Sequence, residues 1–351
     1  MADASCWSPT MTTDADARVR RWLAWAMAAV VLAVAIGGIT RLTQSGLSIT
    51  VWQPVTGVIP PLSAEAWQEA YQSYLRIPEA QGIHRGITLR EFQVLFWWEW
   101  LHRILARVVG LVLAVPYLVL LAQGAIRRGH RARLALLPIL ALAQGALGWY
   151  MVQSGLGTRP TVSAYRLTAH LAMALLIFGI CIWTALDLGR PRGPSAPQPM
   201  VRRGIAAALA LTVATVLSGG LVAGLDAGYI HNTFPLMSGR IIPPGYHVSG
   251  LGLGNPFENP VAAQFHHRLL ALTTAAVVAA LWLVARRRLH PADRPVLTAA
   301  MLLVIVQVGL GITTLLLRVP VSVAVIHQVT GVLLFGAVLA AAHHFRRVTV
   351  R

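Results

Sequence analysis

Eight apolar stretches, each long enough to cross a bilayer, constrain the fold of this chain more than any other feature of its sequence. About 20 predominantly apolar residues span the hydrocarbon core of a membrane as an α-helix. With 56% hydrophobic and 12% charged residues, the composition excludes a pair of ordinary soluble domains. The sequence therefore predicts an all-α integral membrane protein. Its eight transmembrane helices are expected at residues 22–40, 94–122, 133–153, 162–186, 204–224, 262–285, 296–317 and 321–343.

The distribution of arginine predicts how these helices are oriented. The chain contains no lysine, and its arginine clusters lie in the N-terminal tail, at 127–133, at 190–203, at 286–294 and at the C-terminus. Because cytoplasmic loops carry the excess of basic residues, these segments and both termini are expected on the cytoplasmic side of the cell inner membrane. This topology and the anionic inner leaflet explain the net charge of +17, which therefore indicates no nucleic acid partner.

A linker rich in Pro, Gly and Arg divides the chain into two similar halves. Helix 1 ends in IGGITRLTQSGLSI and helix 5 in SGGLVAGLDAGYI, while helix 3 carries AQGALGWYMVQSGL and helix 7 carries VQVGLGITTLLLRV. With four spans each, the halves form a parallel repeat, which predicts two four-helix bundles, a common setting for cofactors. The expected divisions are a cytoplasmic tail at 1–21, the first bundle at 22–188, the linker at 189–203, the second bundle at 204–345 and a cytoplasmic tail at 346–351.

Two long loops are expected on the outer side, between helices 1 and 2 (residues 41–93) and between helices 5 and 6 (residues 225–261). Loops of this length without strong internal structure are usually functional or disordered. Their Trp, Tyr and Pro content favours order. An amphipathic piece at 63–76 is expected to lie along the membrane surface or to cap the bundle.

Four histidines in two matched pairs carry the strongest functional signal. LHRIL at His102 matches HHRLL at His267, and His170 and His327 each stand eight residues before a Phe-Gly pair. The expected topology places all four toward the outer side, near the starts of helices 2, 4, 6 and 8. A single intramembrane histidine is as often a partner in a helix–helix hydrogen bond as it is a functional ligand. Two imidazoles on opposite helices, however, can bind both faces of haem iron, so the pairs predict two metal or porphyrin sites.

Glu99 distinguishes the first half from the second. It precedes His102 by three residues and shares its helix face, whereas Gln264 takes the corresponding position in the second half. A carboxylate beside a metal centre can accept a proton, act as a ligand or stabilise charge. The alternative is a structural ion pair with Arg103 or Arg107. The asymmetry suggests that the first half performs chemistry that the second half serves.

Four arginines near the outer helix ends are candidate ligands for haem propionates. A guanidinium binds a carboxylate with two parallel hydrogen bonds. Snorkelling of the side chain to the membrane interface is an equally good explanation for any one of them. The four are Arg41, Arg103, Arg166 and Arg268.

The remaining histidines and the two cysteines indicate no further site. His266 neighbours His267 but faces about 100° away on a helix, and the others lie in loops or at the cytoplasmic edge. Cys6 lies in the polar tail and Cys181 late in helix 4, so a disulfide between them is not expected. The sequence has no C-x-x-C-H motif, so any haem is expected to be held noncovalently.

With these residues in place, the chain resembles the haem A synthase family, in the form shared by mitochondria and alphaproteobacteria. The resemblance rests on GGITRLTQSGLSITVWQPVTGVIPPL, EFQVLFWWEWLHRILARVVG, YRLTAHLAMALL, AGLDAGYIHNTFPLMSG and QFHHRLLA, and it runs from helix 1 to helix 8. It implies an enzyme that oxidises a ring methyl group of haem O to the formyl group of haem A. The chain lacks the loop cysteine pairs of some bacterial members, which is typical of a cysteine-free branch.

The resemblance also implies roles for individual residues and partners. His267 and His327 would hold a resident haem b, while His102 and His170 would receive the substrate haem O beside Glu99. Haem O synthase, an electron donor such as ferredoxin, membrane lipid and further copies of the chain are the implied partners. Two other readings remain open: a dihaem b-type electron carrier that oxidises quinol, and a proton-coupled transporter with the histidines as a relay.

Overall fold

Eight long helices form the body of the protein. The computed structural model describes residues 13–157, 160–189 and 199–346. Each predicted transmembrane span coincides with one helix that is long and apolar enough to cross a membrane, which confirms the all-α membrane fold. The helices are α1 (Asp14–Leu42), α4 (Leu89–Ala122), α5 (Arg128–Leu156), α6 (Ala164–Asp187), α7 (Pro199–Gly224), α9 (Pro260–Arg288), α10 (Arg294–Leu316) and α11 (Val321–His344).

Capping residues explain where several helices begin. Thr13 and Asp16 form a capping box at the start of α1, so this helix begins eight residues before its predicted apolar span. Thr88 and Glu91 form the same arrangement at the start of α4. Hydropathy predicts only the apolar part of a helix, because the capped polar turns that extend it lie outside the apolar run.

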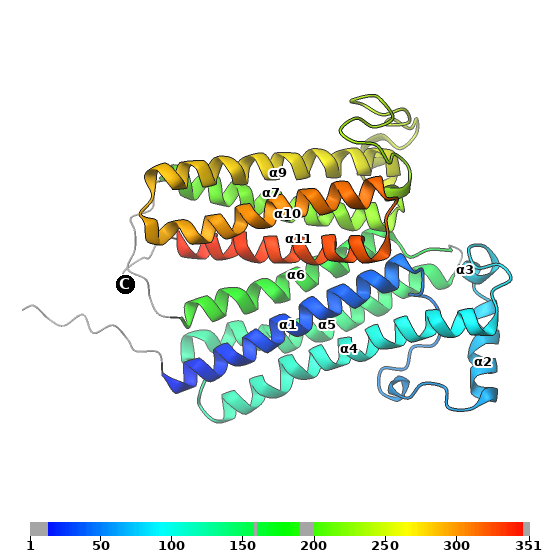
Figure 1. The fold of residues 1–351 in the computed structure, drawn as a ribbon. Helices are drawn as coiled ribbons and strands as arrows, with labels where there is room; N and C mark the ends of the chain where they lie inside the picture. Colours follow the sequence, from blue (N-terminus) through cyan, green and yellow to red (C-terminus); the bar gives the residue numbers. More distant parts are fainter. Residues whose placement is uncertain (1–12, 158–159, 190–198, 347–351) are drawn as a thin grey trace, which may run out of the picture.

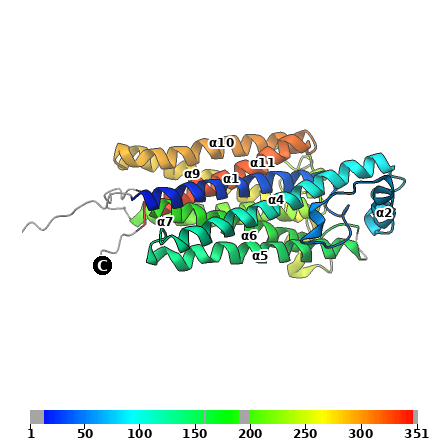
Figure 2. The ribbon, with the colours of Figure 1, turned by 90° about the horizontal axis from the view of Figure 1, so that it is seen from below.

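The long helices pack in two groups of four (Figures 1 and 2). The first helix group consists of α1, α4, α5 and α6, and the second consists of α7, α9, α10 and α11. The groups meet where α6 contacts α7 and α11 and where α1 contacts α11. Phe178 and Phe335 belong to one buried core that continues across this junction. The parallel repeat and the division into two domains stay predictions.

Shorter elements gather at one end of the helices, called the loop end here (Figure 1). Between α1 and α4 lie η1 (Thr56–Val58), α2 (Ala64–Leu75) and α3 (Pro78–Gln81), and α2 runs across the long helices. The amphipathic helix predicted at 63–76 is thus confirmed. Trp67 on α2 packs edge-on against Phe96 of α4, with ring centroids 4.9 Å apart. Between α7 and α9 lie η2 (Ala227–Tyr229), η3 (Gly252–Gly254) and α8 (Asn255–Glu258).

The opposite end, called the tail end, holds the described ends of the chain and a cluster of ion pairs. Asp187 of α6 contacts Arg133 of α5, Arg346 at 2.6 Å and His343 of α11 at 2.9 Å. The cluster therefore fastens the two helix groups together. Cys181 is buried and free, whereas Cys6, most of the linker and residues 347–351 lie outside the described part of the chain.

A buried carboxyl group holds the loop that precedes α4. Glu79 of α3 is 4% exposed, and the Tyr74 hydroxyl lies 3.1 Å from its Oε1 and 2.5 Å from Nδ1 of His84. Burial raises the pKa of Glu79 to about 8, and nearby Glu99 contributes in the same direction. Burial lowers the pKa of His84 below its usual 6.5. Both shifts favour the neutral forms of these groups in the packed loop.

The stability of this loop is expected to fall as pH rises from 6.5 to 8. In the opened loop, an exposed glutamate is already ionised in this window, whereas Glu79 in the packed loop stays largely protonated. The packed loop therefore loses stability as pH rises toward the raised pKa of Glu79. His84 acts in the opposite direction: because its pKa is lowered, it makes the loop less stable only as pH falls below 6.5. Local opening over 64–84, measured by hydrogen exchange corrected for intrinsic rates, should increase about tenfold. A Glu79→Gln variant with the same pH dependence as the unaltered protein would contradict this origin.

Candidate functional site

The four predicted histidines lie on four different helices, two in each helix group. His102 belongs to α4 and His170 to α6, while His267 belongs to α9 and His327 to α11. His102 and His170 thus lie on helices of the first group, and His267 and His327 on helices of the second. That the members of each pair act together stays a prediction.

Each histidine ring lies against a glycine of a neighbouring helix, a feature that the sequence did not reveal. A Cβ built on the glycine would lie 3.2 Å or less from Cε1 of the ring in all four cases. A Cβ at 2.8 or 2.9 Å would force the ring to move, and one at 3.0 or 3.2 Å would require the ring to give by a few tenths of an ångström. The distance from such a Cβ to Cε1 of the ring is 2.8 Å for Gly37 and His102, 3.0 Å for Gly148 and His170, 3.2 Å for Gly219 and His267, and 2.9 Å for Gly311 and His327.

The rings differ in how their Nδ1 atoms are satisfied. Nδ1 of His267 lies 2.8 Å from the Ser218 hydroxyl, which comes from the residue before Gly219. Within the described residues, no side chain binds the buried Nδ1 atoms of His102, His170 and His327. An imidazole can bind haem iron through one ring nitrogen while the other is hydrogen-bonded, as Nδ1 of His267 is here.

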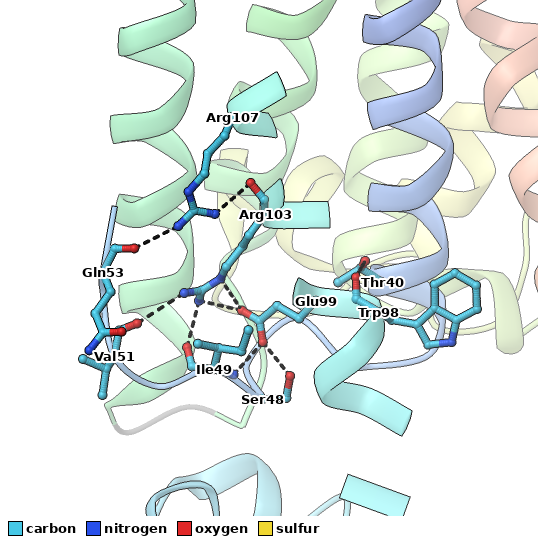
Figure 3. Close-up of polar contacts among 9 residues, drawn as sticks. All are labelled: Thr40, Ser48, Ile49, Val51, Gln53, Trp98, Glu99, Arg103 and Arg107. Carbon is cyan, nitrogen blue, oxygen red and sulfur yellow. Dashed lines mark hydrogen bonds and ion pairs between the residues drawn. The ribbon is translucent and has the colours of Figure 1, made fainter. Parts of the chain in front are cut away.

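Glu99 lies one helical turn before His102 and is almost completely buried, at 2% exposure. Its Oε2 accepts hydrogen bonds from the Ser48 hydroxyl and from the Ile49 backbone N–H, each at 2.7 Å (Figure 3). Its Oε1 accepts bonds from Nε of Arg103 at 3.0 Å and from Nη2 at 2.6 Å. The ion pair with Arg103 that the sequence left open is therefore present, whereas Arg107 does not contact this carboxylate in Figure 3.

Arg103 and Arg107 fasten the start of the long loop to α4. Arg103 donates to the carbonyls of Ile49 at 2.8 Å and Val51 at 3.3 Å (Figure 3). One turn later, Arg107 donates to two further carbonyls of this segment, at residues 53 and 54. Glu99, Arg103 and Arg107 are spaced by four residues, so one face of α4 binds the loop over residues 48–54.

Gln264 and Arg268 make the corresponding contacts in the second helix group, without the carboxylate. Nε2 of Gln264 donates to the His231 carbonyl at 3.4 Å. Arg268 donates to the same carbonyl at 2.5 Å and to that of Thr233 at 2.7 Å. The side-chain oxygen of Gln264 is buried without a partner in the described residues. Both groups thus hold a loop with an arginine, but only the first places a negative charge there.

The other two candidate arginines are also engaged. Arg41 at the end of α1 donates to the Ala223 carbonyl at 2.7 Å and to Asp226 at 2.9 Å, so it bridges the two helix groups. Arg166 donates to the Tyr150 carbonyl at 2.7 Å, and its guanidinium carbon lies 3.6 Å from the centroid of the Tyr150 ring. Their expected contact with propionates stays a prediction. Asp226 was not a candidate from the sequence, because its partner lies 185 positions away.

Comparison with known proteins places the chain in a family. The COX15-CtaA family, described as cytochrome oxidase assembly protein, matches residues 20–339. A protein of Nitrosospira multiformis named heme A synthase is 44% identical over 332 residues, covering 93% of both chains. One of Rhizobium meliloti with the same name is 47% identical over 331 residues, covering 92% of this chain and 88% of the relative. Another, of Mesorhizobium japonicum, is 44% identical and covers 98% and 95%. The chain therefore belongs to the COX15-CtaA family of cytochrome oxidase assembly proteins.

Proposed function

We propose that this chain is a haem A synthase, which oxidises a ring methyl group of haem O to a formyl group and so supplies haem A for cytochrome oxidase assembly. The similarity to proteins named heme A synthase extends over nearly the whole chain and supports this activity. The geometric observation that carries the proposal is the contrast between the two histidine pairs. Among the described residues, only the first pair has a buried carboxylate one turn away, and Gln264 replaces it in the second.

His267 and His327 are proposed to hold a noncovalent haem b. A ligating histidine usually donates its second ring N–H to a fixed acceptor, and the Ser218 hydroxyl is placed to receive it from His267. Gly219 and Gly311 leave space for the two rings, so the residues present fit the group. When bound, this haem would supply one-electron transfer.

His102 and His170 are proposed to bind the iron of the substrate haem O. Gly37 and Gly148 provide the same kind of space for these rings as the glycines of the second group. In the described residues, no side chain takes the place beside His102 or His170 that Ser218 has beside His267.

Glu99 is proposed to stabilise positive charge that develops on the substrate as electrons are removed. Each carboxylate oxygen accepts two hydrogen bonds, so all its acceptor positions are occupied. Taking up a proton would therefore require breaking one of them. A fixed, buried negative charge needs no such rearrangement, because it is already oriented when the charge appears. Charge stabilisation is thus the better supported of the roles that the sequence left open.

Arg41 and Arg268 are proposed to bind haem propionates. The Nε atoms of Arg41 and Arg268 are buried and have no partner among the described residues, so each guanidinium retains a donor. Arg103 uses all three nitrogens on Glu99 and the loop, and Arg166 is stacked on Tyr150.

The arginine clusters at 127–133 and 286–294 lie at the tail end, which favours a cytoplasmic tail end and haem sites toward the outer side.

The two helix groups are proposed to act as a substrate-haem domain and a resident-haem domain, bounded as the sequence suggested. Haem O synthase would deliver the substrate, and a small electron-transfer protein such as a ferredoxin would serve the resident haem. The support is chemical, because haem O is poorly soluble in water and each oxidation step moves electrons that must leave or enter the site.

The glycine contacts give a prediction that separates packing from general helix stability. Gly311→Ala should displace the His327 ring and lower the resident haem content of the purified protein by about tenfold. Gly309→Ala is the matched control on the same helix, because a Cβ there meets nothing within 4 Å. Haem content per chain from the pyridine haemochrome spectrum measures both. Equal haem content in the two variants would remove the steric role of Gly311.

The proposed activity can be tested in cells that make haem O but lack a haem A synthase of their own. Expression of this chain should restore haem A in extracted membrane pigments and the spectrum of an a-type oxidase. Restoration should be lost with His102→Ala. Membranes that contain the chain and haem O but form no haem A would contradict the proposal.

A further inference from the structure

Two glycine pairs each lie against a histidine of one pair and against the helix that carries a histidine of the other pair. In α1, Gly37 contacts the ring of His102, and the adjacent Gly38 contacts the side chain of Gln328 on α11. A Cβ on Gly38 would lie 2.6 Å from Oε1 of Gln328. Gln328 directly follows His327 in the chain. One dipeptide of α1 therefore lies between a histidine of the first pair and the neighbour of a histidine of the second.

The contact on Gln328 is fixed by a hydrogen bond between the two helix groups. Its Nε2 donates to the Val34 carbonyl of α1 at 3.0 Å. This carbonyl lies one helical turn before Gly38, so the amide donates to α1 through Nε2 and lies beside Gly38 with Oε1. The position of α11 at His327 thus depends on α1, where Gly37 provides the space for His102.

The second glycine pair repeats this arrangement in the opposite direction. In α7, Gly219 contacts the ring of His267, and a Cβ on the adjacent Gly220 would lie 3.0 Å from Oγ1 of Thr168 and 3.4 Å from its Cα. Thr168 lies on α6, two residues before His170. Each group therefore provides one glycine for its own histidine and one for the histidine-bearing helix of the other group.

Close helix packing alone explains small residues at these positions. It does not explain why, in both pairs, one glycine meets a candidate ligand and the next meets the helix of a ligand of the other pair. Helix contacts that leave no room for a Cβ transmit displacement, because packed interiors have little free volume. The hydrogen bond of Gln328 adds a polar link whose loss need not disturb the rest of the interface.

We propose that the contact of Gln328 with Val34 and Gly38 couples the two histidine sites, so that occupancy of the site at His102 changes the position of His327 and the redox behaviour of the group that it binds. Gln328 is then a positioning residue, because it acts through its neighbour. Coupling between two sites is reciprocal: the redox state of the second site changes the affinity of the first by the same factor. This inference rests on the proposed function.

The test measures that factor directly. The probe is the zinc form of the haem O porphyrin, which is redox-silent and diamagnetic, added to purified protein that carries its resident haem. Its dissociation constant is determined with the resident haem oxidised and with it reduced. The two values should differ about fivefold or more in the unaltered protein. The low-spin electron paramagnetic resonance signal of the resident haem should shift when the probe binds.

Gln328→Leu keeps the size of the side chain but cannot donate to the Val34 carbonyl, so the ratio should fall toward one and the spectral shift should vanish. Gly38→Ala should have the same effect, because its Cβ displaces the Gln328 amide. It replaces Gln328→Leu in the test if that variant folds poorly. Thr330→Val is the matched control on α11, because its hydroxyl donates only to the Ile326 carbonyl of its own helix at 2.8 Å.

Two outcomes would overturn the coupling alone: no difference between the two dissociation constants in the unaltered protein, or an unaltered ratio in Gln328→Leu that retains its haem. An unaltered protein that binds no haem at all would instead contradict the proposed function. The two failures are therefore distinguishable by the absorption spectrum of the starting material.

Discussion

Glu99→Gln is expected to slow the conversion of haem O by about 10²- to 10⁴-fold while leaving the absorption spectrum of the resident haem unchanged. Glutamine keeps the size of the side chain and can still accept from Ser48 and Ile49, but it removes the buried carboxylate whose place Gln264 takes in the second helix group. The measurement is the amount of haem A formed over time by purified protein supplied with haem O and an electron mediator.

A matched control separates this charge from the attachment of the loop. Ser48→Ala removes one of the four hydrogen bonds to Glu99 and leaves the carboxylate and Arg103 in place. Its conversion rate should stay within about tenfold of the unaltered rate, because a net hydrogen bond contributes on the order of 1 kcal/mol. If Glu99→Gln converts haem O as fast as Ser48→Ala does, the charge has no role in the reaction.

His267→Ala should abolish the resident haem. Removing an axial imidazole takes away one of the two iron ligands, and Ser218 and Gly219 offer no replacement. The reduced-minus-oxidised spectrum of the purified protein should lose its b-type bands, and conversion of haem O should fall with them. His327→Ala should give the same result.

His266→Ala is the control at the neighbouring position. The His266 ring lies 3.1 Å from the Tyr246 hydroxyl and packs against Phe265, away from the predicted pair. This variant should keep the b-type bands, and so should His102→Ala, which should nevertheless fail to convert haem O. Loss of the resident haem in His102→Ala with retention in His267→Ala would reverse the assignment of the two sites.

The sequence predicted the helices because apolar runs are a local pattern, and the same kind of local match predicts the histidine pairs. A long apolar run spans a membrane wherever it lies in the chain, and matched motifs in two halves placed His102 and His267 at equal depth. The boundaries were less accurate where capping residues such as Thr13 extend a helix into polar sequence.

Contacts between distant segments could not be predicted in the same way. Two of the groups that donate to Glu99, the Ser48 hydroxyl and the Ile49 N–H, lie about fifty positions away in a loop whose path follows no periodicity. The glycine contacts had a visible signal, because the Gly-Gly pairs of helices 1 and 5 were recognised as a repeat. Their meaning required knowing which helix lies against which, and the same holds for Gln328 and α1.

Extraction of pigments from the purified protein tests the central claim most directly, namely that one histidine pair holds a permanent haem and the other receives the haem to be oxidised. The protein is purified from cells with and without haem O synthase, and the extracted haems are separated and quantified. We predict haem B alone in its absence, and haem B together with haem O or haem A in its presence. Haem B alone under both conditions would contradict the claim and favour an electron carrier, and a protein without any haem would favour a transporter.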